Sequence, residues 1–149
     1  MKTLSIYLES LLDDDDVFYD PKKEIEVWIR NEYKVTGKLT ISDDLVVDCS
    51  GDVEVKNKNI ESLTNGLFRW GKVGGMFDCY ACKNLKSLEG APKEVDGDFN
   101  CSYCDSLKSL DGAPKEIGGT FYCFNCAGQF TEDDVKKISN IKNNIICSK

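Results

Sequence analysis

Hydrophobic and aromatic positions recur along this chain at a fixed spacing. The pattern Phe-x-Cys-x-x-Cys occurs at residues 77–82, 99–104 and 121–126, so its period is 22 residues. The intervening segments match as well, since Leu-Lys-Ser-Leu stands at both 85–88 and 107–110 and Gly-Ala-Pro-Lys-Glu follows each copy. Such a period is the mark of a repeat protein.

The repeat extends outward with less regular units. Val53-Glu-Val55 precedes Phe77 by 24 residues, and Ile145-Ile-Cys147 follows Phe121 by 24 residues. Leu39-Thr-Ile41 is a candidate for one further strand. Atypical end units are expected because the first and last coils must close an otherwise exposed core.

Each apolar-any-apolar triplet predicts a short strand whose first and third side chains point inward. Three residues are too few for a strand to be stable alone, so we expect the triplets of successive coils to stack into a parallel sheet. The Leu-x-x-Leu segment then crosses the interior and Gly-Ala-Pro turns the chain. Two buried columns follow. One contains Phe77, Phe99 and Phe121, and the next contains Cys79, Cys101, Cys123 and Cys147.

Helices are predicted at both ends of the repeats. Leucines at helical spacing predict a helix over residues 3–12, and Asp20-Pro21 followed by Ile25, Trp28 and Ile29 predicts a second. Thr131 to Asp134 begins a third, short helix by capping logic. The expected fold is an α+β repeat solenoid, in one compact domain, with a helical cap over 1–36 and the solenoid over 37–149.

Composition and charge reduce the number of ligand classes that this chain is expected to bind. The chain has 149 residues, of which 41% are hydrophobic, and its net charge is −7 with the 19 basic residues scattered, which argues against nucleic acid as a ligand. No apolar run approaches the roughly 20 residues that span a bilayer, and the N-terminus does not read as a signal peptide, so we expect a cytoplasmic protein with no membrane contact.

Catalytic chemistry is not indicated. The chain contains no histidine, and neither a nucleophile elbow nor a phosphate-binding loop occurs, so an enzyme is not expected. Asp13–Asp16 could attract a divalent cation, but the run lacks the alternating ligands and central glycine of a calcium loop. We interpret it as a solvated linker.

The cysteine pairs allow two interpretations. Cys79, Cys82, Cys101 and Cys104 have the spacing of a four-cysteine zinc site, which would make this a small protein stabilised by structural zinc. However, a third pair at Cys123 and Cys126 would be left over, and the repeat alone explains the register. We therefore favour buried, reduced thiols that fill a narrow interior, with no cofactor.

The strand register also predicts which residues face outward. The central outward column is Glu54, Asp78, Asn100, Tyr122 and Ile146. The positions after the strands are Lys56, Tyr80, Ser102 and Phe124, with Tyr103 one place further. Exposed tyrosine and phenylalanine are enriched at protein interfaces, although they can also merely shield a sheet. Our hypothesis is a partner-binding patch of Tyr80, Tyr103, Tyr122 and Phe124 beside Asp78 and Asn100.

The unit Phe-x-Cys-x-x-Cys-x-x-Leu resembles the leucine-rich repeat, with Cys104 in the Asn/Cys position and Leu107 after it. The segments 37–42, 60–71, 87–95 and 130–137 are similar to those of leucine-rich-repeat-like proteins encoded by large tailed bacteriophages of gut bacteria, including crAss-like phages. This resemblance implies a viral protein in the host cytoplasm or the virion that binds a host or virion protein. It implies no active-site residues.

Overall fold

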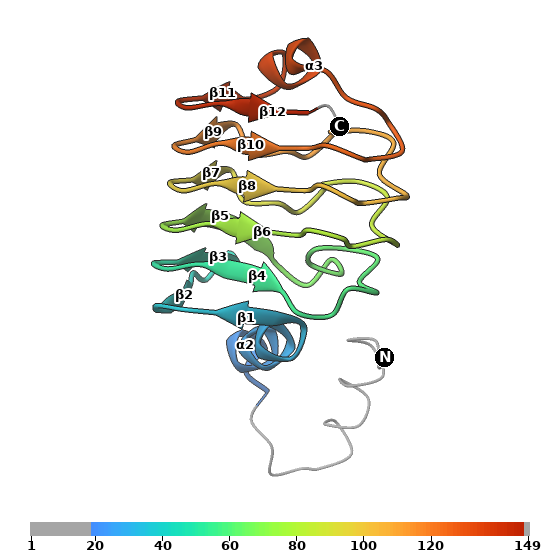
Figure 1. Cartoon of the computed structure of the whole chain (residues 1–149). Helices are drawn as coiled ribbons and strands as arrows, with labels where there is room; N and C mark the ends of the chain where they lie inside the picture. Colours follow the sequence, from blue (N-terminus) through green and yellow to red (C-terminus); the bar gives the residue numbers. More distant parts are fainter. Residues whose placement is uncertain (1–18, 148–149) are drawn as a thin grey trace.

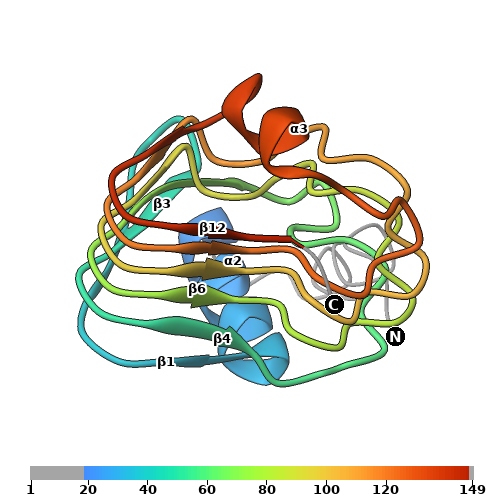
Figure 2. The same ribbon diagram turned by 45° about the horizontal axis from the view of Figure 1, so that its top comes forward.

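The computed structural model describes residues 19–147, which form a β-solenoid with strands in two stacked six-stranded sheets (Figures 1 and 2). Sheet A contains, in spatial order, β1 (Tyr33–Val35), β4 (Val53–Val55), β6 (Phe77–Asp78), β8 (Phe99–Asn100), β10 (Phe121–Tyr122) and β12 (Ile145–Ile146). Sheet B contains β11 (Asn140–Ile141), β9 (Glu116–Ile117), β7 (Glu94–Val95), β5 (Arg69–Val73), β3 (Val46–Cys49) and β2 (Leu39–Ile41).

Sheet A confirms the predicted register. Phe77, Phe99 and Phe121 pair in parallel on successive strands, and all three are fully buried. Their ring centroids are 5.8 Å and 5.2 Å apart. The second predicted column is also buried, with Cys79 and Cys101 at 0% exposure, Cys123 at 1% and Cys147 at 8%.

Of sheet B, only the strand Leu39–Ile41 was predicted, and it forms β2. In the regular coils its strands are two-residue segments, Glu94–Val95 and Glu116–Ile117, in which only the second side chain is buried. Val73, Val95 and Ile117 pair in parallel and form the inward column of this sheet. Each Gly-Ala-Pro turn therefore leads the chain into a second strand, and the coil has two short sides of paired backbone.

Glycine is required where sheet B turns into sheet A. A Cβ placed on Gly97 would lie 2.8 Å from the carbonyl carbon of Gly75 in the preceding coil. Beside such corners, an aspartate side chain bonds the backbone of the next coil. Asp52 Oδ1 accepts a hydrogen bond from Met76 N at 2.8 Å, and Asp98 Oδ1 accepts one from Thr120 N at 2.7 Å. The corners thus stack backbone directly on backbone.

The N-terminal end of the stack is covered by a helix, α2 (Pro21–Glu32), which lies below β1 in Figure 1. The predicted start is confirmed, because Asp20 is the N-cap and its side chain accepts a hydrogen bond from Lys22 N. Ile25 and Ile29 are buried against the core. Both sheets end here in a reversed strand, since β1 and β2 are antiparallel to β4 and β3. The predicted helix over 3–12 and the run Asp13–Asp16 lie outside the described residues.

The C-terminal end carries α3 (Glu132–Lys136), above β12 in Figure 1. Its predicted cap is confirmed as a full capping box, in which Thr131 and Asp134 bond each other's backbone N–H groups. Val135 is fully buried and Ile138 packs against the core. Within residues 19–147, none of the helices is both long and apolar enough to cross a lipid bilayer.

Candidate protein-interaction site

Three aromatic side chains from successive coils form a continuous row on the surface beyond sheet A. Tyr80 contacts Tyr103 with ring centroids 5.3 Å apart and planes at 62°, and Tyr103 contacts Phe124 at 5.3 Å and 82°. Tyr80 and Tyr103 are each 40% exposed. Edge-to-face contacts of this kind are favourable and hold the rings in place. We call Tyr80, Tyr103 and Phe124 the aromatic row.

The turn between the paired cysteines explains why Tyr103 joins this row. Ala81, Tyr103 and Asn125, which precede the second cysteine of each pair, all have left-handed backbone with φ near +58°, +58° and +55°. A left-handed residue breaks the alternation of a strand, so positions beyond it cannot be read from strand register. The prediction that Ser102 faces outward is accordingly wrong. Ser102 is fully buried, and its Oγ accepts a hydrogen bond from Phe124 N at 3.2 Å.

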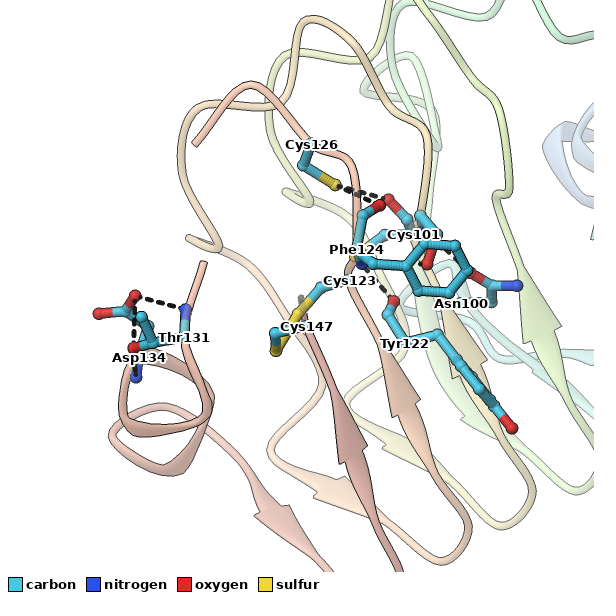
Figure 3. Close-up of a disulfide and its surroundings, with 10 residues drawn as sticks. Asn100, Cys101, Tyr122, Cys123, Phe124, Cys126, Thr131, Asp134 and Cys147 are labelled. Atoms are coloured by element: carbon cyan, nitrogen blue, oxygen red, sulfur yellow. Dashed lines mark hydrogen bonds between the residues drawn. A yellow bond between two sulfur atoms is a disulfide. The ribbon is translucent and has the colours of Figure 1, made fainter. Parts of the chain in front are cut away.

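The remaining predicted residues lie beside the row but differ in role. Asp78 and Asn100 use their side-chain oxygens to accept hydrogen bonds from Tyr80 N at 2.8 Å and Ser102 N at 3.0 Å, so they stabilise the turns that present the row. Burial raises the pKa of the Asp78 carboxyl, opposed by the bond from Tyr80 N and by Lys58. Tyr122 is half-buried in the outward column of sheet A, and its ring points away from Phe124 (Figure 3).

Beneath the row, the cysteines donate hydrogen bonds to backbone carbonyls. Cys79 is the first cysteine of its pair, and its Sγ donates to the Asn100 carbonyl at 3.2 Å. Among the second cysteines of the pairs, Cys104 Sγ donates to the Cys79 carbonyl at 3.2 Å, and Cys126 Sγ donates to the Cys101 carbonyl at 3.1 Å. The first cysteine of a pair thus donates a hydrogen bond to the backbone of the following coil, and the second donates to that of the preceding coil. The repeated cysteines therefore have a structural role that their spacing alone did not reveal.

The surroundings of the thiols affect how well they could bind zinc. In the zinc interpretation the four ligands are Cys79, Cys82, Cys101 and Cys104. Burial raises the pKa of the Cys82 thiol to about 12, from 9.0. The hydrogen bond with Cys104, together with burial, raises that of Cys79 well above its ordinary value. Zinc binds thiolate, so binding here would have to overcome both shifts. In the part of the chain that the structure describes, no three Cys, Asp or Glu side chains are grouped so as to hold a metal ion.

The last two cysteines of the column that begins at Cys79 form a disulfide, which differs from the expectation of reduced thiols. Cys123 and Cys147 are joined with a Cα–Cα distance of 4.5 Å (Figure 3). Their position explains the bond, because the parallel pairing of β10 with β12 puts the two residues opposite each other at the strand ends. The bond fastens the last strand of sheet A to the stack.

The site is thus a row of two exposed tyrosine rings and the half-buried ring of Phe124, held by hydrogen-bonded turns and a cysteine-lined interior. Its arrangement suits contact with another surface, since rigid rings on a stacked sheet offer area without much loss of side-chain entropy. No family model matches this chain, and comparison with curated proteins and with solved structures gives no significant match.

Proposed function

We propose that this protein is a non-enzymatic protein–protein interaction module that binds a protein partner through the sheet A face, with the aromatic row at the centre of the contact. The observation that carries the proposal is the edge-to-face packing of Tyr80, Tyr103 and Phe124 on the surface. Aromatic side chains dominate the energetics of many interfaces, and solenoids commonly bind through an extended face. Tyr122 extends the contact along the sheet, while Asp78 and Asn100 hold the turns.

Sequence resemblance supports a more specific version of this proposal. The coils are of leucine-rich-repeat type, and the protein is encoded by a large tailed bacteriophage of the crAss-like kind. Its partner is then a host or virion protein, and it acts in the host cytoplasm or within the virion. The support is the repeated Phe-x-Cys-x-x-Cys-x-x-Leu unit and the similar segments around it.

Site-specific photocrosslinking tests the face directly. A photoreactive phenylalanine analogue is placed at Tyr103 or, as a control, at Val27, which is 52% exposed on α2. The protein is expressed in infected bacterial host cells, irradiated and purified, and crosslinked proteins are identified by mass spectrometry. We expect a protein joined to position 103 that is missing at position 27.

A quadruple variant then tests whether the aromatic side chains themselves are needed for binding. Replacement of Tyr80, Tyr103, Tyr122 and Phe124 with serine should abolish capture of that protein, while Val27→Ser should leave it unchanged. Circular dichroism and urea unfolding establish that both variants are folded. Undiminished capture by the folded quadruple variant would refute the proposal.

A further inference from the structure

A groove runs along a different side of the stack, at the turns that lead into sheet B. Its volume is about 940 Å³. Three successive coils contribute to it, because residues 61–70, 87–93 and 112–115 all supply lining positions. The floor is apolar or small, formed by Phe68, Trp70, Ala91, Pro92 and Ala113. The aromatic row lies elsewhere, at the turns that follow sheet A.

One rim of the groove is basic. Arg69, Lys93 and Lys115 line it, and all three are exposed. Lys93 and Lys115 are stacked one coil apart, since Lys115 N donates to the Lys93 carbonyl at 2.9 Å. None of the three forms an ion pair with another residue of the range 19–147, although Lys72 nearby pairs with both Glu94 and Asp96 at 3.5 Å. Three exposed cations that form no ion pair are unexpected in a chain of net charge −7.

The groove also has acidic lining residues, Glu61 and Glu89. A polyanion that carries charge on all sides would approach these carboxylates as well as the basic rim. An extended peptide avoids this conflict, because successive side chains point to opposite sides and residues two apart repeat every ~6.8 Å. It can place carboxylates on one side only and apolar side chains on the floor.

We propose that this groove binds an extended acidic segment of a partner protein, whose carboxylates face Arg69, Lys93 and Lys115 and whose apolar side chains lie over Ala91 and Ala113. Charge complementarity selects the occupant, and the apolar floor adds burial. The inference concerns a surface separate from the aromatic row and does not depend on what binds there.

Fluorescence anisotropy with a defined peptide tests the proposal on the full chain. The probe is a fluorescein-labelled ten-residue peptide of alternating glutamate and leucine, and its counterpart has lysine for glutamate. We expect the acidic peptide to bind and the basic one not to bind. The variant K93Q/K115Q should weaken binding by about tenfold, since two exposed charge contacts are lost together.

The matched control is K86Q/K108Q. Lys86 and Lys108 are also exposed and also 22 residues apart, but they do not line the groove. Equal weakening by both variants, or the absence of binding by the acidic peptide, would overturn the proposal. So would equally tight, Lys93-dependent binding of a labelled ten-nucleotide RNA. Replacement of Asp13–Asp16 by asparagine provides a further check. If the acidic peptide then bound more tightly, the replaced aspartates must have competed with it for the groove. The occupant would then be the chain's own acidic run, and the assignment to a partner protein would be wrong.

Discussion

Replacement of Gly97 by alanine tests the backbone-on-backbone stacking of the corners. The added Cβ would lie 2.8 Å from the carbonyl carbon and oxygen of Gly75 and 3.0 Å from Met76 N. These are backbone atoms, which cannot rotate away as a flexible side chain could. Relief to an ordinary contact requires the coils to separate by about 0.6 Å in an interior packed at near-crystalline density. The hydrogen bond from Gly97 N to the Gly75 carbonyl, 2.9 Å long, would be stretched.

We expect Gly97→Ala to lower the free energy of unfolding by about 3 kcal/mol, the upper part of the range for overpacking. Gly66→Ala is the control. Gly66 has φ of +71°, but its Cβ would meet nothing within 4 Å, so only the left-handed backbone is penalised, at about 1 kcal/mol. Urea unfolding followed by the fluorescence of Trp28 and Trp70 measures both. Equal losses in the two variants, or a smaller loss for Gly97→Ala, would refute the stacking argument.

Three further changes test other parts of the fold. Ser102→Ala should lower the free energy of unfolding by about 1–2 kcal/mol, because Phe124 N loses its acceptor; an unchanged urea midpoint would contradict this. Cys147→Ser should destabilise the oxidised protein by about 3 kcal/mol, because the Cys123–Cys147 bond closes a loop of 24 residues, and adding a thiol reductant should bring the wild type to the variant's melting temperature and leave the variant unchanged. The free energy of unfolding should also fall as pH rises from 9.0 towards 12, because the folded state keeps the Cys82 thiol protonated at pH values where the same thiol of the unfolded chain has ionised. Urea midpoints measured between pH 7 and 11 should therefore fall less steeply in Cys82→Ala than in the wild type. Identical slopes would exclude a contribution from this thiol.

Sheet A could be predicted, except for β1, which lies in the segment assigned to the helical cap, because its inward positions hold large or distinctive side chains at a constant spacing. Phe77, Phe99 and Phe121 mark the period, and the cysteines two residues later fix the strand direction. Sheet B gave no comparable signal. Each of its regular strands contributes a single inward residue, such as Val95 or Ile117, and one buried position cannot show a period of two.

The outward residues were predictable only as far as the strand continues. Tyr122 and Asn100 lie within strands and face the side expected. Ser102 and Tyr103 lie in a turn whose left-handed residue is Tyr103 itself, rather than the usual glycine or asparagine. The sequence therefore gave no signal that the backbone turns at this point. The basic lining of the groove was foreseen only in part. The repeat puts Lys93 and Lys115 at equivalent positions, but Arg69 joins them only through the stacking of sheet B.

The parallel pairing of Phe77 with Phe99 and of Phe99 with Phe121 has a consequence for how such a protein changes over time. Each coil meets its neighbours through the same positions, so residues 77–98 and 99–120 are interchangeable parts. Duplication or loss of one such part would lengthen or shorten the molecule by a single strand spacing, about 4.8 Å, and would leave both end caps intact. The extent of both sheets, and of the face proposed to bind a partner, can therefore change in unit steps, independently of which side chains that face carries.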